Sequence, residues 1–432
     1  MRFGPLARAY LLIALALVLG LAIAYRFVEP APPSRIVMAT GPEGGAYRGY
    51  SEAYRAVFAR NGVELELRAS AGSVENLALL RDGAAGVAAA LVQGGLADPG
   101  GESGVLQTLG GMFVEPLWLF TRLEPTPTRL LELAGRRIAV GAPGSGTRAQ
   151  ALKLLAGSGV NGGNATLIES PATEARAALA AGAADAVFLV GAASAEAVRE
   201  LAHVPGAALV DYAHADAYAQ VDRTVEAVTL ARGALDFAAD IPSRPVRMPA
   251  TTADLVVRAD LHPALKELLV MAAQEVHGPG SVLNPPGRFP SRYATALPLA
   301  PEAARFYENG PPFLQRYMPF WAATLVDRLA VLLIPLVTVL VSAWQVLPPL
   351  VTSLMENRVY RWYAPLIEVE AAVRGADAGR LEEARAELAR IDREVSRIRI
   401  PASYHHLVFR LRSHLDLVRA RVEALERSAG KG

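Results

Sequence analysis

The longest uncharged stretch of this chain runs from Leu329 to Met355 and contains 27 residues. An α-helix rises about 1.5 Å per residue, so about 20 apolar residues cross the hydrocarbon core of a bilayer. The alternative is a buried helix of a soluble protein, which rarely continues this far without a charge. Pro335 lies inside the stretch, and membrane helices tolerate proline. The stretch therefore predicts a membrane-spanning helix, with a large part of the chain before it and a small part after it.

A second apolar stretch lies near the N-terminus. Residues 9–25 carry no charge and follow Arg2 and Arg8. A basic start before an apolar run is typical of a signal peptide or of a first membrane helix. We expect residues 1–34 to form such an anchor or signal segment. In either case the part that follows is predicted to be exported.

Residues 35–310 alternate short apolar runs with helical periodicity, which predicts repeated βαβ units and parallel sheets with helices on both faces. The expected strands are 35–40, 63–69, 87–93, 137–141, 165–168 and 185–190. The expected helices are 46–61, 73–82, a helix from about 146, and 173–181. The series is interrupted at 116–127, and this break predicts two lobes.

Two further apolar runs are candidates for strands that cross between the lobes. They are 117–121 and 225–230. With these crossings, lobe 1 is predicted at about 35–118 and 229–310, and lobe 2 at about 122–224. Two lobes joined by two crossings make a hinged clamshell.

Two glycine-rich turns, 40–47 and 141–147, each follow an expected strand and open an expected helix. Such a turn presents unpaired backbone N–H groups at the positive end of the helix, where an anion or carboxylate binds well. A structural connection is the alternative reading for any single turn. Because open α/β sheets bind ligands beyond the carboxyl ends of their strands, we expect several such loops to converge on one ligand.

The candidate ligand-binding residues all lie in these loops. Glycines allow close backbone approach, Tyr47 offers an aromatic wall with a polar tip, and Ser73 is also a plausible helix cap. The candidates are Gly44, Gly45, Tyr47, Ser73, Asn76, Gln93, Gly144, Ser145, Gly146, Thr147 and Gly191.

After Glu356 the composition becomes rich in arginine, glutamate, alanine and leucine. Apolar residues recur at steps of three and four in 381–398, and again in 411–425 after a break at Pro401. This spacing predicts the apolar seam of a helical hairpin or short coiled coil over 356–432. A charged hairpin that packs only on itself and one that docks a partner both fit the pattern.

Several classes of function are disfavoured. The chain has no cysteine, so disulfides and thiolate chemistry are excluded. With 43 basic and 42 acidic residues, the charge gives no case for a nucleic-acid partner. The glycine turn at 141–147 has Thr147 where a phosphate-binding loop needs lysine. The seven histidines show no metal-ligand spacing. We expect neither a cofactor, nor a metal site, nor an enzyme.

Taken in order, the motifs at 40–47, 72–77, Gln93, 115–116 and 141–147 resemble the TAXI family of TRAP-transporter solute receptors. The resemblance covers roughly residues 35–310. It implies an α/β fold of the periplasmic-binding-protein type II class, whose interlobe cleft captures a small organic anion of the dicarboxylate or amino-acid class. It also implies a bacterial, periplasmic location and a multispanning TRAP permease as partner.

The chain departs from the usual receptor of that family, which ends near the position of Gly310 and is free or lipid-anchored. Without cysteine, a lipid anchor on that residue is excluded. Instead, residues 311–355 are expected to form a membrane-proximal segment and transmembrane helix, and 356–432 a helical hairpin. Arg358 and Arg361 favour a cytoplasmic C-terminus. The sequence thus predicts a receptor tethered in the bacterial inner membrane that serves a permease. The alternative is a sensor that signals through its membrane helix to the hairpin.

Overall fold

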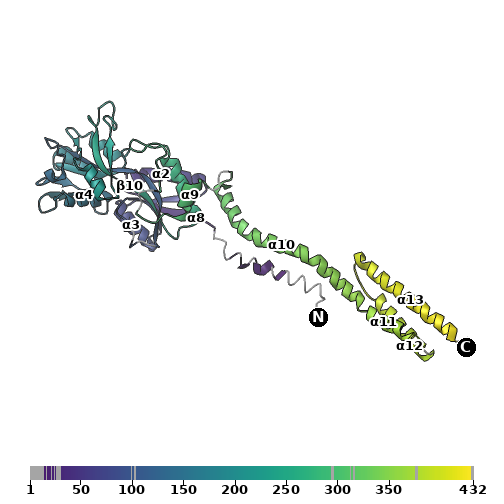
Figure 1. Cartoon of the computed structure of the whole chain (residues 1–432). Helices are drawn as coiled ribbons and strands as arrows, with labels where there is room; N and C mark the ends of the chain where they lie inside the picture. The colour runs from purple at the N-terminus through teal and green to yellow at the C-terminus, as the bar shows by residue number, and fades with distance from the viewer. Residues whose placement is uncertain are drawn as a thin grey trace. The chain divides into compact units, whose positions relative to one another are not determined.

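The computed structural model describes residues 14–15, 17–20, 22–23, 25, 31–98, 100–101, 104–292, 296–311, 313–314, 317–374 and 378–429. The predicted N-terminal segment 1–34 lies mostly outside these residues. The chain divides into two compact units. One is Pro30–Leu325, and the other combines Met1–Glu29 with Val326–Gly432. Figure 1 shows the sheets in the first unit and the long helices α10–α13 at the other end of the chain.

Lobe 1 of the Pro30–Leu325 unit is built on a sheet with the strand order β2-β1-β3-β10-β4. Its first strands alternate with helices, and β1 pairs in parallel with both β2 and β3. The elements are β1 (Arg35–Ala39), α2 (Ala46–Arg60), β2 (Glu64–Arg68), α3 (Ser73–Arg81), the 3-10 turn Gly83–Ala85 and β3 (Val87–Gln93). Two later helices, α8 (Pro263–His277) and α9 (Pro301–Asn309), complete the lobe. Apolar residues of α2, α8 and the sheet form its core.

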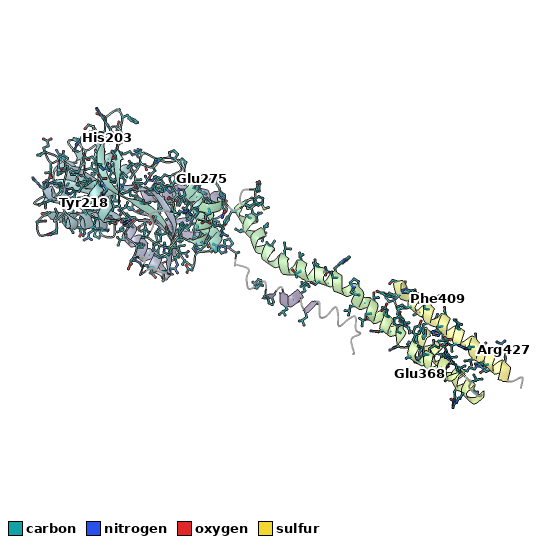
Figure 2. The ribbon with its side chains drawn as sticks, viewed as in Figure 1. His203, Tyr218, Glu275, Glu368, Phe409 and Arg427 are labelled. Atoms are coloured by element: carbon teal, nitrogen blue, oxygen red, sulfur yellow. The ribbon has the colours of Figure 1, made fainter. Side chains whose placement is uncertain are left out.

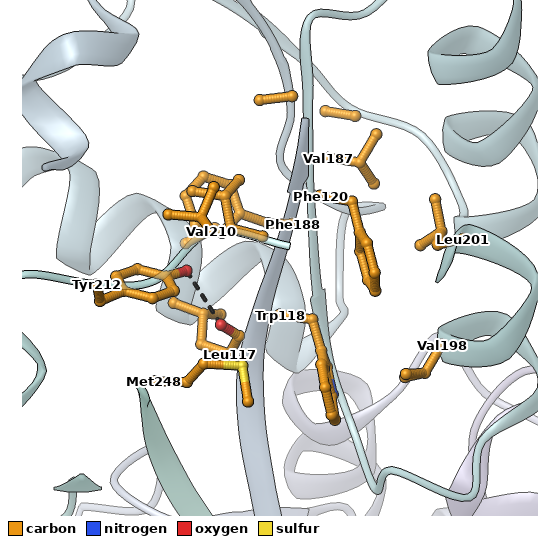
Figure 3. Packing of buried hydrophobic residues seen from close by; sticks show 14 of the residues in the cluster. Leu117, Trp118, Phe120, Val187, Phe188, Val198, Leu201, Val210, Tyr212 and Met248 are labelled. Atoms are coloured by element: carbon orange, nitrogen blue, oxygen red, sulfur yellow. Dashed lines mark hydrogen bonds between the residues drawn. The ribbon is translucent and has the colours of Figure 1, made fainter. Parts of the chain in front are cut away.

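Lobe 2 continues the sheet in the order β4-β7-β5-β6. Its elements are the 3-10 turn Leu130–Leu133, β5 (Arg137–Ala139), α4 (Gly146–Gly157), β6 (Thr166–Ile168), α5 (Ala172–Ala181), β7 (Ala186–Val190), α6 (Glu196–Ala202), β8 (Ala208–Leu209), α7 (Ala215–Val221) and β9 (Glu226–Leu230). Figure 3 shows its core, where the rings of Trp118 and Phe120 stack 6.4 Å apart on one face of β4. On the other face, the Tyr212 hydroxyl donates to the Leu117 carbonyl at 3.0 Å.

Two long antiparallel strands join the lobes. They are β4 (Leu106–Thr121) and β10 (Val246–Arg258). In each strand one half packs in the lobe 1 core and the other half in the lobe 2 core. The predicted strand and helix series are confirmed to within about two residues at their ends. The first crossing was expected at 117–121 and belongs to β4.

The return crossing differs from the expectation. The run 225–230 forms β9, which pairs only with β10 and packs in the lobe 2 core. The strand that returns is β10, and its residues up to Ala250 also belong to that core. The second crossing therefore falls near Thr251, later than the expected 229. The sequence pattern does not predict β10, because Pro249 and the polar residues Thr251, Thr252 and Asp254 interrupt the apolar run.

The second unit is helical. It contains most of α10 (Phe320–Tyr360), then α11 (Tyr363–Ala372), α12 (Ala378–Ser396), the 3-10 turn Ala402–Tyr404 and α13 (His405–Ala429). Helices α12 and α13 lie side by side, and Figure 2 labels Phe409 and Arg427 on α13. The seam residues Leu381, Leu388, Ile391, Leu415 and Val418 are buried in a core of their own. Leu425 is the seam residue that stays at the surface.

Among the described residues, one helical segment is long and apolar enough to cross a membrane. It lies within Leu336–Ala372 and overlaps the uncharged stretch of the sequence. Several large apolar side chains of α10 are exposed in this segment and just before it, namely Leu333, Val337, Leu340, Val341 and Trp344.

We predict that Leu415→Ala loosens the α11–α13 core and that Leu417→Ala does not. Leu415 is fully buried, whereas Leu417 is 71% exposed two residues along the same helix. Removing a buried leucine side chain costs about 2–5 kcal/mol, and a surface change stays within about 0.5 kcal/mol. Hydrogen exchange of the α12 and α13 amides in the full chain is the measurement. Equal protection in the two variants would contradict the core assignment.

Candidate functional site

A cavity of about 570 Å³ lies between the two lobes. Its walls come from the starts of five helices, α2 and α3 of lobe 1 and α4, α5 and α6 of lobe 2. Nine of the sequence-predicted residues line it: Gly44, Gly45, Tyr47, Ser73, Gln93, Ser145, Gly146, Thr147 and Gly191. The loops converge because each follows the carboxyl end of a strand of the same mixed sheet.

Two predicted residues, Asn76 and Gly144, do not line the cavity. The Asn76 amide donates to the carbonyls of Thr40 at 2.5 Å and Leu91 at 2.9 Å, so it ties two strand ends together. The Gly144 carbonyl accepts the Glu75 N–H at 3.2 Å. Asn76 therefore fastens two strands of lobe 1, and Gly144 joins the loop before α4 in lobe 2 to α3 in lobe 1. Sequence spacing places a polar residue in a loop but does not say which way its side chain turns.

The floor of the cavity is a chain of hydrogen bonds between buried side chains. The Gln93 amide donates to the Thr251 hydroxyl at 3.1 Å, and the Gln93 N–H donates to the Ser73 hydroxyl at 3.0 Å. The Tyr47 hydroxyl lies 3.2 Å from Ser73 Oγ and donates to Glu115 Oε2 at 2.8 Å. Ser73 is thus held in the network and is not the capping residue of its helix, because α3 has Gly72 at that position with no side-chain cap.

Glu115 is the most informative residue that sequence reasoning missed. It lines the cavity, is 2% exposed, and stands opposite Thr251 where β4 and β10 cross. Burial raises the pKa of its carboxyl from about 4.5 to about 8, although the hydrogen bond from Tyr47 opposes the change. The signal was present in the sequence, since Glu115 is the sole ionisable residue in the run 106–121.

Asp254 lies near Glu115 on β10. It is also buried, and burial together with the charge of Glu115 raises the pKa of its carboxyl well above the usual range. Its Oδ1 has no hydrogen-bond partner among the described residues. Two buried carboxyls at the crossing therefore both favour the protonated form.

The loop between β6 and α5 was also missed. Ser170, Pro171, Ala172 and Thr173 line the cavity. The Ser170 hydroxyl is buried without a hydrogen-bond partner in the described part of the chain. This loop follows its strand in the same way as the glycine-rich turns, so the rule that found those turns applies to it. It lacks glycine, which is why the sequence did not single it out.

The lobes touch on both sides of the cavity. At one rim Gly72 of lobe 1 lies against Ser145 of lobe 2, because a Cβ on Gly72 would be 3.4 Å from Ser145 Cα. Gly146 lies against Gln93 and Ser73 there, because a Cβ on Gly146 would touch both side chains. At the other rim Tyr50 and Ser194 bring their hydroxyls to 3.5 Å, and a Cβ on Gly44 would lie 3.7 Å from Glu196 Oε2. These contacts from both lobes border the cavity, which stays open to solvent.

The charged residues that line the cavity are all acidic: Glu43, Glu115, Glu196 and Glu200. No lysine, arginine or histidine is among the lining residues, all of which the structure describes. Backbone N–H groups at the starts of α4 and α5 supply the positive end of the site. The described residues hold no cluster of three or more side chains suited to a metal ion.

We predict that Glu115 contributes a decline in the stability of the fold as pH rises from about 4.5 to about 8, and that Glu115→Gln removes this contribution. Below pH 4.5 Glu115 is protonated in both states. Above it the unfolded chain releases the proton while the folded protein, with its pKa of about 8, retains it. Each pH unit then costs up to about 1.4 kcal/mol.

Thermal unfolding of the full chain between pH 5 and pH 8 measures this slope. Glu43→Gln is the control, because Glu43 lies at the same cavity but is exposed. A slope that Glu115→Gln leaves unchanged would show that Glu115 is ionised in the folded protein at neutral pH.

Comparison with known proteins adds the following. No curated protein sequence matches the chain. A solved structure from Bordetella bronchiseptica RB50 is 16% identical, covering 58% of this chain and 73% of that one, with a TM-score of 0.40. An ancestral arginine-binding protein bound to arginine is 15% identical, covering 56% and 92%, with a TM-score of 0.37. The periplasmic aliphatic sulphonate binding protein SsuA from Escherichia coli is 12% identical, covering 70% and 84%, with a TM-score of 0.37.

A protein-family model matches the part of the chain that contains the cavity. The model of the NMT1-like family matches residues 38–263, which include both crossing strands and every residue that lines the cavity. This match spans just over half of the chain. The protein therefore belongs to the NMT1-like family.

Proposed function

We propose that this protein is a receptor for a small organic solute, which binds in the cavity between the lobes. The observation that carries the proposal is the cavity itself: it lies at the crossing of β4 and β10 and takes its walls from both lobes. A ligand that touches both walls stabilises the closed arrangement over an open one, and its binding energy is what shifts that equilibrium.

The proposed solute belongs to the dicarboxylate or amino-acid class. Its carboxylate is held by backbone N–H groups at Gly146, Thr147 and Thr173, where α4 and α5 begin. Tyr47 supplies an aromatic wall. The Thr147 hydroxyl accepts the Val190 N–H at 3.0 Å, so its first role is to fix the start of α4 against β7. The cavity has no cofactor or metal in this proposal, and the protein is not an enzyme.

We further propose that the receptor is tethered in a bacterial inner membrane, with its lobes in the periplasm and its C-terminus in the cytoplasm. The exposed apolar side chains of α10 support a lipid environment, because water disfavours a patch of this kind. By its resemblance to TAXI receptors, the closed form serves a TRAP-type permease in the same membrane. Tethering keeps the receptor at a high effective concentration near such a partner.

A sensor is the second candidate function. The observation in its favour is that α11–α13 form a folded segment with a core of their own and carry exposed Phe409 and Leu417. In this case ligand binding biases the membrane helix, and a separate cytoplasmic protein provides the output. Purification of the full chain from native membranes separates the two: a multispanning permease in the complex supports transport, and a cytoplasmic partner supports sensing.

We predict that Gly146→Ala weakens solute binding by about tenfold or more. A methyl group at this position collides with the Gln93 amide oxygen and lies 3.0 Å from Ser73 Oγ. Gln93 is buried and bonded to Thr251, so it moves only at a cost. Overpacking of this kind costs about 1–3 kcal/mol, and 1.4 kcal/mol corresponds to a factor of ten.

Gly157→Ala is the matched control, because Gly157 lies in the same helix and a Cβ there meets nothing within 4 Å. Thermal stabilisation of the full chain in detergent, titrated with amino acids and dicarboxylates, reports binding. Absence of saturable stabilisation by any of these compounds, or equal binding by the two variants, contradicts the proposed site.

A further inference from the structure

The charges around the cavity restrict the solute more than its size does. Four glutamates line it and no basic side chain does. The nearest arginines of the helix starts are engaged elsewhere, Arg48 with Glu52 at 2.7 Å and Arg148 with Glu169. A solute with two carboxylates finds helix starts on both lobes but no basic side chain, and at the crossing strands its second carboxylate would face Glu115. Like charges in a site of low polarity repel strongly.

Glu115 is placed to contact the solute directly. It is almost fully buried, lines the cavity, and accepts a hydrogen bond from Tyr47 on Oε2. Its position opposite Thr251 fixes the backbone on which it stands, because both strands are paired there. A buried carboxyl gains most from a partner that donates hydrogen bonds and carries positive charge.

Resting on the proposed solute-receptor function, we propose that the solute carries a protonated nitrogen and that this group donates a hydrogen bond to Glu115. The solute is then an amine-bearing acid and not a dicarboxylate without nitrogen. Its carboxylate faces the starts of α4 and α5 in lobe 2, and its ammonium group faces the crossing strands. Such a molecule binds both lobes through opposite charges, so it favours closure from both sides.

The neighbours of Glu115 agree with this assignment. Tyr47 and Tyr50 on α2 and Asp254 on β10 are the titratable groups that influence it or that it influences. None of them is a cation. The Tyr47 hydroxyl donates to Glu115. The Gln93 side-chain amide donates to the Thr251 hydroxyl, and the Gln93 backbone N–H donates to the Ser73 hydroxyl. A protonated nitrogen of the solute would therefore be the first cation beside this carboxyl.

The proposal predicts the sign of proton exchange on binding. Burial keeps Glu115 largely protonated in the empty cavity, with a pKa of about 8. An ammonium group beside it favours the ionised form, so binding releases a proton. A carboxylate beside it favours the protonated form, so a dicarboxylate takes up or retains a proton.

The experiment uses the full chain in detergent and pairs of compounds that differ by one amine, such as L-glutamate with glutarate and L-leucine with 4-methylpentanoate. Calorimetry in two buffers of different ionisation enthalpy gives the affinity and the protons exchanged. We expect the amine-bearing member of at least one pair to bind about ten- to a hundredfold more tightly, with proton release.

Glu115→Gln is expected to remove most of that preference and the proton release, while Glu64→Gln, at an exposed glutamate of β2 outside the cavity, retains both. If Glu115→Gln does not fold, the pairwise preference and the proton count of the unmodified chain still decide. Tighter binding of the compounds without nitrogen, or proton uptake, overturns this inference and leaves the solute receptor standing. No binding by any compound overturns the proposed function and the inference together.

Discussion

The pairing of β4 with β10 is the interaction on which the rest of the Pro30–Leu325 unit depends. These two strands are the only ones in the described sheet whose side chains enter the cores of both lobes. The walls of the cavity belong to the two lobes, and each lobe packs its core against this pair of strands. If the lobes close on a solute as proposed, the backbone near Glu115 and Thr251 is where the change would occur, because both strands pass from one core to the other there.

Burial of the Glu115 carboxyl where β4 pairs with β10 is unfavourable for its ionised form, and it also marks the cavity as a candidate functional site. An ionised carboxyl removed from water is unfavourable, and here the group stays protonated near neutral pH unless something stabilises its charge. One hydrogen bond from Tyr47 lessens the cost without removing it. Perturbed groups in clefts are frequent at functional sites, and this one combines burial, a cavity and a position where β4 and β10 pass between the two cores.

Periodicity made most of the fold predictable. The βα series is regular, so its strands and helices follow from the sequence, and the glycine turns mark where parallel strands end. What failed was anything set by long-range pairing. The strand β10 carries Pro249 and several polar residues, and only its neighbours β3, β4 and β9 explain why it is a strand.

The candidate site was predictable to a similar depth. The positions of the loops could be predicted, because they follow from the order of strands and helices. The roles of single side chains could not, because they depend on which way each side chain turns. Asn76 and Glu115 show the two directions of error. Asn76 has the chemistry of a ligand contact, yet its amide is used by two backbone carbonyls. Glu115 stands in a run of apolar residues, and only the crossing of the strands brings it to the cavity.

The cavity and the candidate membrane span lie in different units of the chain. All residues that line the cavity lie between Gly41 and Glu200, inside the Pro30–Leu325 unit. The α11–α13 helices have a core without any contribution from that unit. Under the proposed function, the lobes alone would capture the solute, and the helical unit would set the outcome of that capture. The two proposed functions, transport and sensing, use the same cavity. They differ in the partner, which is a permease for transport and a cytoplasmic protein for sensing.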